Sequence, residues 1–174
     1  FVVLGTGVEE LGSDMFTNCQ SLTGIYFRGD APQCEGDLAR SVHENLRVHH
    51  LPDAEGFTGP WMGFPTAIVS EAPSAPQGLE AEPLDRSIRL TWVAPNESVG
   101  GELLYYIVYR NGNAISGPII ETSFTVKDLN NWDKSTFEVT ACNIAGESPA
   151  SNEVEESPNP VSEHLPLLGR IGTI

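Results

Sequence analysis

Apolar residues occupy every second position in short runs over the second half of the chain. Turn-forming residues separate the runs, which are Leu79 and Ala81; Ile88, Leu90 and Trp92; Tyr106 and Val108; Phe124 and Val126; and Phe137, Val139 and Ala141. A period of two is typical of strands that bury one face. Many short strands between turns predict a sandwich of two antiparallel sheets. Asn111-Gly112 favours a type I′ hairpin turn, because both residues tolerate a positive φ.

A different pattern repeats near the start of the chain. Val2 and Leu4 recur as Ile25 and Phe27, each displaced by 23 residues. That offset lies within the range of about 20–29 residues found in leucine-rich repeats. Spacings of three to five between further apolar residues indicate a short helix or turn packed against the strands: Val8, Leu11, Phe16, Cys19 and Leu22. About one repeat and a half is visible.

The stretch from Val8 to Leu22 carries a Gly, a Phe, a Cys and a Leu in that order before a strand. This order resembles the BspA-like leucine-rich repeat. The resemblance implies that Cys19 is a small buried apolar residue and not a reactive thiol. A bridge between Cys19 and Cys34 stays open.

Residues 31–69 follow a looser pattern. We expect a short polar helix-like piece around Leu38 to Leu46, a strand at 48–52, a loop with Gly and Trp, and a final strand that ends at Val69. The segment resembles the one that closes BspA-like repeat arrays. A cap of this kind covers the apolar end of a solenoid, and we therefore assign residues 1–69 to the end of such an array.

Residues 70–76 are small, polar and proline-rich, which indicates a semi-rigid linker before a second domain at 77–157. This second region resembles a fibronectin type III domain over residues 73–157. The resemblance is carried by Pro76 with Leu79, by Trp92, by the run 106–109, by Leu129 before Phe137, and by the run 141–148. The family usually has Tyr at the position of Phe137, and loss of that hydroxyl's hydrogen bond costs on the order of 1 kcal/mol. The expected fold is mainly β.

The tail at 158–174 begins with linker-like prolines and contains a small apolar cluster at 165–171. The cluster either begins another domain or packs on the sandwich, and the sequence leaves both open. Position 1 is Phe, and no signal-like segment follows it, so we expect the natural start of the protein to lie upstream. We also expect further repeats and any anchor outside this stretch.

The net charge of −15 opposes binding to phosphates or anionic lipid headgroups. Nucleic acid and direct membrane insertion are therefore not expected. Three cysteines are too few for a disulfide framework, and no ligand spacing typical of a metal site occurs. His43, His49, His50 and Cys34 are the closest approach to one, but adjacent His49 and His50 on a strand would face opposite sides. No metal or cofactor is expected.

Catalytic motifs are not apparent. No Gly-x-Ser-x-Gly turn occurs, and neither a repeat end nor a small sandwich offers a cleft for a carboxylate pair. Cys142 is out of phase with the inward residues of its strand, so we expect a thiol that faces away from the core, free at the surface or at the sheet edge.

Four other features have a plain structural explanation beside a functional one. Arg28-Gly29-Asp30 matches an integrin-recognition tripeptide, but a turn after a strand favours Gly and Asp in any case. Trp61 and Trp132 either pack under loops or expose a ring that stacks on a sugar or a protein. Asn96-Glu97-Ser98 fits an N-glycosylation sequon in a loop.

The two resemblances imply a non-catalytic protein fragment, secreted or at the cell surface, that binds proteins or glycans. The alternative is an accessory or linker region of a secreted carbohydrate-active or other hydrolytic enzyme. No single binding residue is assigned at this point, because a fold alone does not identify a site.

Overall fold

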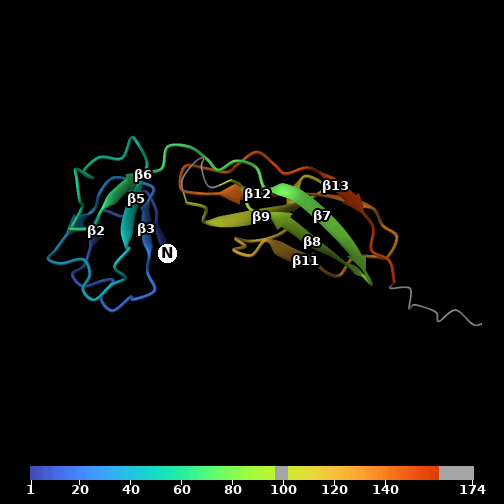
Figure 1. The fold of residues 1–174 in the computed structure, drawn as a ribbon, viewed down its shortest axis with the longest axis horizontal. Coiled ribbons are helices and arrows are strands. Elements are labelled where there is room, and N and C mark those ends of the chain that lie inside the picture. Colours follow the sequence, from blue (N-terminus) through green and yellow to red (C-terminus); the bar gives the residue numbers. More distant parts are fainter. Residues whose placement is uncertain (97–101, 161–174) are drawn as a thin grey trace, which may run out of the picture.

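The computed structural model describes residues 1–96 and 102–160, and within these ranges every regular element is a β-strand. Mainly β architecture is thus confirmed (Figure 1). The strands are β1 (Val2–Leu4), β2 (Glu10–Leu11), β3 (Gly24–Phe27), β4 (Gln33–Cys34), β5 (Arg47–His50), β6 (Thr66–Ile68), β7 (Gln77–Leu84), β8 (Ser87–Val93), β9 (Tyr105–Arg110), β10 (Asn113–Ala114), β11 (Ser123–Val126), β12 (Ser135–Cys142) and β13 (Val154–Glu156).

The first part of the chain, which we call the parallel unit (residues 1–69), contains a parallel sheet in the order β1-β3-β5-β6. Val2 pairs with Ile25, and Ile25 pairs with Val48. Glu10 on β2 pairs with Gln33 on β4. All three pairs join residues 23 apart, so the chain returns to the same position in the parallel unit every 23 residues, and we call each such turn of the chain a coil. The 23-residue spacing continues into β5, beyond the repeat and a half that the sequence indicated.

The expected helix-like piece around Leu38 to Leu46 is absent, and turns take its place. Carbonyl groups at Asp37, Leu38 and Arg40 accept hydrogen bonds from the backbone N–H groups of Asp14, Phe16 and Asn18 at 2.7, 3.2 and 2.9 Å. Coil-to-coil bonds therefore use carbonyl groups that a helix would pair within itself. The left-handed backbone of Ser41, with φ of 53°, also interrupts the segment.

The core of the parallel unit lies between its sheet and its connecting turns. It is built mainly from aliphatic and aromatic side chains: Leu11, Phe16, Ile25, Phe27, Leu38, Leu46, Val48, Phe57 and Trp61. Cys19 and Cys34 are free thiols that pack at its margin. The resemblance implied a buried Cys19, whereas both thiols are only half-buried.

The second part is a sandwich of two antiparallel sheets, in the orders β10-β9-β12-β13 and β11-β8-β7. The buried core holds ten of the side chains that the period of two predicted, together with Leu129: Leu79, Ile88, Leu90, Trp92, Tyr106, Val108, Val126, Phe137, Val139 and Ala141. The other two predicted residues, Ala81 and Phe124, are partly buried against this core. Asn111 and Gly112 have φ of 50° and 74°, which confirms the predicted hairpin turn. Phe137 is fully buried in this core.

The described part of the chain holds no helix with the length and apolar character needed to cross a bilayer. The apolar cluster predicted at 165–171 lies outside the described residues.

Candidate interaction surfaces

Trp132 projects from the loop between β11 and β12, and 70% of its surface is exposed. Its backbone N–H donates to the carbonyl of Pro158 at 2.8 Å. Its φ of 73° is an outlier for a bulky residue, and such conformations cost on the order of 1–3 kcal/mol. The fold therefore holds a large apolar ring in solvent and in a strained conformation.

The neighbours of Trp132 fix the loop that carries it. The Asn130 side chain donates to Asp133 at 2.9 Å. Asn131 accepts from the backbone N–H of Arg86 and donates to the Asp85 carboxylate, both at 2.8 Å. These bonds tie the loop to the β7–β8 turn, so the ring sits on a pre-ordered support.

Trp61, in contrast, is buried. It is 8% exposed, and its ring lies 5.1 Å from that of Phe27 and 5.5 Å from that of Phe57. Of the two tryptophans that the sequence offered for ligand stacking, only Trp132 presents its ring to solvent.

A third cluster joins the parallel unit to the sandwich. Tyr26 and Val69 pack with Leu104 and Ile144, and all four are nearly inaccessible to solvent. The 70–76 segment adds to the contact, because the carbonyl of Glu71 accepts a hydrogen bond from the Asn143 side chain at 2.8 Å. Figure 1 shows the two parts end to end at this junction.

Polar groups border this junction cluster. The Tyr26 hydroxyl donates to the carboxylate of Glu102, and His49 Nε2 lies 3.8 Å from the same carboxylate. Burial and then Glu102 raise the pKa of Tyr26 above its usual range. Burial lowers the pKa of His49, while Glu102 acts in the opposite direction. Both groups are thus favoured in their neutral forms.

The candidate metal ligands do not come together. His49 stacks on Tyr26 with ring centroids 4.4 Å apart, whereas His50 stacks on Phe57 at 4.6 Å. The two histidines face opposite sides of β5, as the strand period predicted. Among residues 1–96 and 102–160, no group of three or more His, Cys, Asp or Glu side chains could hold a metal ion.

Arg28, Gly29 and Asp30 form a turn after β3. The Arg28 N–H bonds to the carbonyl of Leu4 at 3.0 Å, and an Asp30 oxygen accepts from the Glu55 N–H at 2.8 Å. The Asp30 carboxylate thus has a structural role in stacking one coil on the next.

The expectation of a free surface thiol at Cys142 is wrong. Cys142 is not part of the sandwich core but is only 3% exposed, and it forms an isolated antiparallel bridge with Glu147. Burial, and then the nearby Glu147, raise the pKa of the thiol to about 11. Arg28 of the parallel unit opposes this rise, so its charge reaches Cys142 across the junction.

The sequon at Asn96 lies only partly in the described chain, because Glu97 and Ser98 are outside it. Sequence reasoning did not single out Glu102 or the contact between Glu71 and Asn143. Asn143 is part of the run 141–148 that carries the fibronectin type III resemblance, but nothing in that run indicates its bond to Glu71. Glu102 stands in a stretch without periodicity, so no sequence signal distinguishes it from other polar residues.

Comparison with known proteins agrees with the architecture of the second part. The family model described as fibronectin type III domain matches residues 74–157. Residues 74–157 are a fibronectin type III domain. The domain explains the two sheets and the position of Trp92 in the core.

Related proteins match about half of the chain. The human cell adhesion molecule DSCAM is 33% identical over 102 residues, which are 51% of this chain and 5% of the length of that relative. A crystal structure of titin domains is 26% identical with a TM-score of 0.47, and covers 54% of this chain and 34% of its own. A crystal structure of chicken CNTN1 domains is 17% identical with a TM-score of 0.46, and covers 54% of this chain and 35% of its own.

Proposed function

We propose that this chain is a non-catalytic segment of a secreted or cell-surface adhesion protein, and that Trp132 contributes a binding contact to a partner protein. The observation that carries the proposal is the exposed, strained ring on a hydrogen-bonded loop of the fibronectin type III domain. Tryptophan is enriched among the residues that dominate binding energy at protein interfaces. The likeness of this region to a cell adhesion molecule supports the same role.

Hydrogen bonds already order the loop that carries Trp132, so binding of a partner does not require the entropic cost of ordering it. Asn131 ties the residue before Trp132 to Arg86 and Asp85, and a side-chain hydrogen bond from Asn130 to Asp133 spans the position of the ring. A pre-ordered contact residue loses little entropy on association, so more of the burial energy remains as affinity. The strain at Trp132 reduces stability and is compatible with selection for the exposed position of the ring.

The test uses chain 1–174 displayed on beads and cells that carry a mixed set of surface proteins. We expect cell binding that is lost after surface protease treatment and that falls by about tenfold or more in Trp132→Ala. Ile120→Ala is the matched control, because Ile120 is 71% exposed but lies outside the supported loop. Glycosidase sensitivity without protease sensitivity would show a glycan ligand instead. Equal binding by the Trp132 and Ile120 variants would contradict the proposal.

We also propose that residues 1–69 are the end of a BspA-like leucine-rich repeat array, that 70–76 links it to the fibronectin type III domain, and that 158–174 is a tail or linker. The 23-residue register between β1, β3 and β5 supports the first assignment. Sequencing the gene upstream of Phe1 tests it: further 23-residue repeats are expected. A catalytic domain beside this stretch would favour the accessory-enzyme alternative.

A further inference from the structure

The outer edge of β11 has no neighbouring strand in the described chain. The sheet ends there, with β8 on the other side of β11 (Figure 1). The Trp92 N–H bonds to the Thr122 carbonyl at 3.1 Å, and β11 pairs with β8 in antiparallel register. Backbone groups alternate in such a ladder. Those of Phe124 and Val126 therefore face β8, whereas those of Ser123 and Thr125 face outward.

A groove of about 380 Å³ runs beside this edge. Ile115, Phe124 and Val126 give it apolar walls, and Thr125 lies along it. A strand that paired with the outward N–H and C=O of Thr125 would place alternate side chains in the groove. Sandwiches normally protect such an edge, since it is a template for strand pairing.

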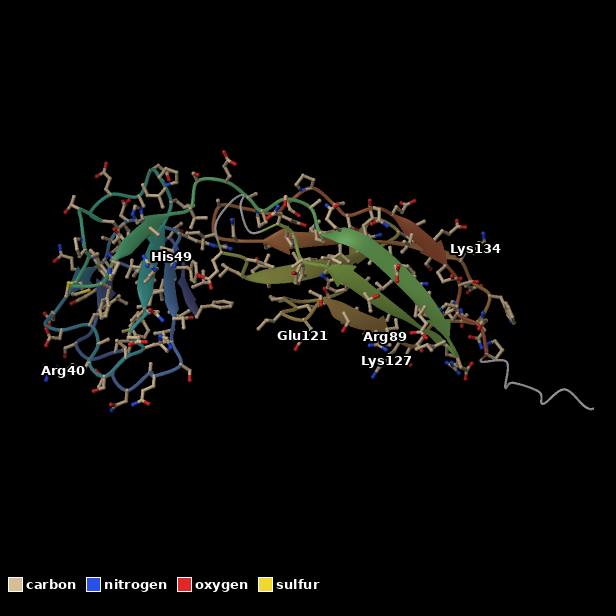
Figure 2. The ribbon with its side chains drawn as sticks, in the orientation of Figure 1. Arg40, His49, Arg89, Glu121, Lys127 and Lys134 are labelled. Atoms are coloured by element: carbon tan, nitrogen blue, oxygen red, sulfur yellow. The ribbon has the colours of Figure 1, made fainter. Side chains whose placement is uncertain are left out.

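The charges around the groove indicate what would bind there. Arg110 and Lys127 line it together with one acid, Asp128. Arg89 lies on β8 between Thr125 and Glu82, so it has an acidic neighbour and is not part of the groove lining. Figure 2 shows Arg89 and Lys127 at the same end of β11, away from Glu121. Within residues 1–96 and 102–160, neither Arg110 nor Lys127 forms an ion pair, and the Arg110 Nε donates to the Ser135 hydroxyl at 2.9 Å. Two cations against one acid make the groove locally basic, which favours an acidic partner at this site.

Pairing of β11 with the β11 of a second copy is disfavoured, because it would bring together two grooves that are each lined by Arg110 and Lys127, and like charges repel. We propose that the β11 edge and its groove bind an extended acidic peptide segment of another protein by strand addition. Main-chain hydrogen bonds to Thr125 give the affinity, and acidic side chains near Lys127 and Arg110 give the preference. The inference rests on the proposed interaction role but uses a surface separate from the Trp132 ring.

The test is titration of chain 1–174 with a capped eight-residue peptide of alternating Glu and Val, followed by calorimetry and by backbone amide NMR. The matched probe is the Lys and Val peptide of the same length. We expect the Glu peptide to bind about tenfold or more tightly than the Lys peptide, since complementary charge sets the preference. Amide shifts should concentrate at Ser123, Thr125 and Lys127.

Three variants separate the contribution of the main-chain hydrogen bonds from that of the charge preference. Thr125→Pro removes an edge donor that faces away from β8, so the internal ladder is kept, and binding should weaken about fivefold or more. Lys127→Glu should weaken binding about threefold or more by charge reversal. Lys134→Glu makes the same charge change at the start of β12, and should leave binding within about twofold.

Three results would overturn the inference: equal binding of both peptides, shifts that avoid β11, or full binding by Lys127→Glu. Edge-dependent dimers of the free chain in sedimentation, abolished by Thr125→Pro, would show a second copy as the occupant. Because the assay does not use Trp132, Trp132→Ala should bind the peptide normally. Failure of this inference and failure of the proposed function are thus distinguishable.

Discussion

The side chain of Asn152 replaces a missing strand partner at the start of β7. Gly78 has φ of 58°, and the register between β7 and β8 is irregular from Gln77 to Glu80. Leu79 has no partner on β8 in this register. Asn152 accepts from the Leu79 N–H at 2.9 Å and donates to its carbonyl at 3.0 Å. One exposed amide therefore satisfies both backbone groups of a buried core residue.

Asn152→Ala is expected to lower the free energy of unfolding by about 1–2 kcal/mol, because it removes both bonds and leaves Leu79 less well paired. Asn152→Asp keeps the acceptor and loses the donor, so its loss should be smaller. Urea denaturation of chain 1–174, followed by Trp fluorescence, measures both. A neutral alanine variant would show that water replaces the amide at no cost.

At the scale of the element, β5 places two neighbouring histidines in different surroundings. His49 faces the junction and stacks on Tyr26, and His50 faces the opposite side and stacks on Phe57. The alternation itself follows from the strand and was predicted from the sequence. That His49 would lie against Glu102 was not predictable, because the two residues are separated by 53 positions and the contact exists only after the two parts dock.

The low pKa of His49 gives a direction for the pH dependence. The groups that act on it are Glu102, Arg47 and His50, with Tyr26 stacked on the ring. Its pKa is lowered below the usual 6.5, so the unfolded state binds more protons below that pH. Stability is thus full above about pH 6.5 and is lost as the pH falls through the interval down to the folded-state pKa.

His49→Phe should keep the stacked ring and reduce the loss of stability as the pH falls below about 6.5. His43→Gln is the control, since His43 lies in the turn before Leu46 and away from the junction. Thermal unfolding at a series of pH values gives the slope for each variant. An unchanged slope in His49→Phe would assign the acid sensitivity to another group.

At the scale of the whole molecule, the parallel unit and the sandwich share a small apolar cluster. Tyr26 and Val69 come from one part, and Leu104 and Ile144 from the other. Asn143 and Glu71 add a direct hydrogen bond at 2.8 Å between the sandwich and the linker. Buried side chains of this size transmit strain between the parts that they join. Residues 70–76, for which the sequence predicts a semi-rigid linker, thus contact the sandwich directly at Glu71.

Ile144→Asp should uncouple the two parts, because it places a charge in the shared cluster. We expect the calorimetric unfolding of chain 1–174 to change from one transition to two, and small-angle scattering to show a larger maximum dimension. Ile120→Asp is the matched control at a position that is 71% exposed. Two transitions already in the unaltered chain, with no effect of Ile144→Asp, would show that the cluster does not couple the parts.

By itself the sequence determined the repeating features. The period of two gave the sandwich core from Leu79 to Ala141, and the offset between Val2 and Ile25 gave the register of the parallel sheet. Both follow from the geometry of a single strand or coil, which is local and repeats along the chain. A turn at Asn111-Gly112 is predictable for the same reason, since the φ values depend on those two residues.

Tertiary structure alone decided which surfaces are covered. It buried Trp61 and exposed Trp132, covered Cys142, and brought Glu102 to Tyr26 and His49. It also replaced the expected helix near Leu38 by turns, because backbone N–H groups of the preceding coil, at residues 14–18, donate to the carbonyl groups of this segment. These outcomes depend on contacts between segments far apart in the chain. The free energy of such contacts comes from burial and desolvation of both partners, so neither local sequence contains it.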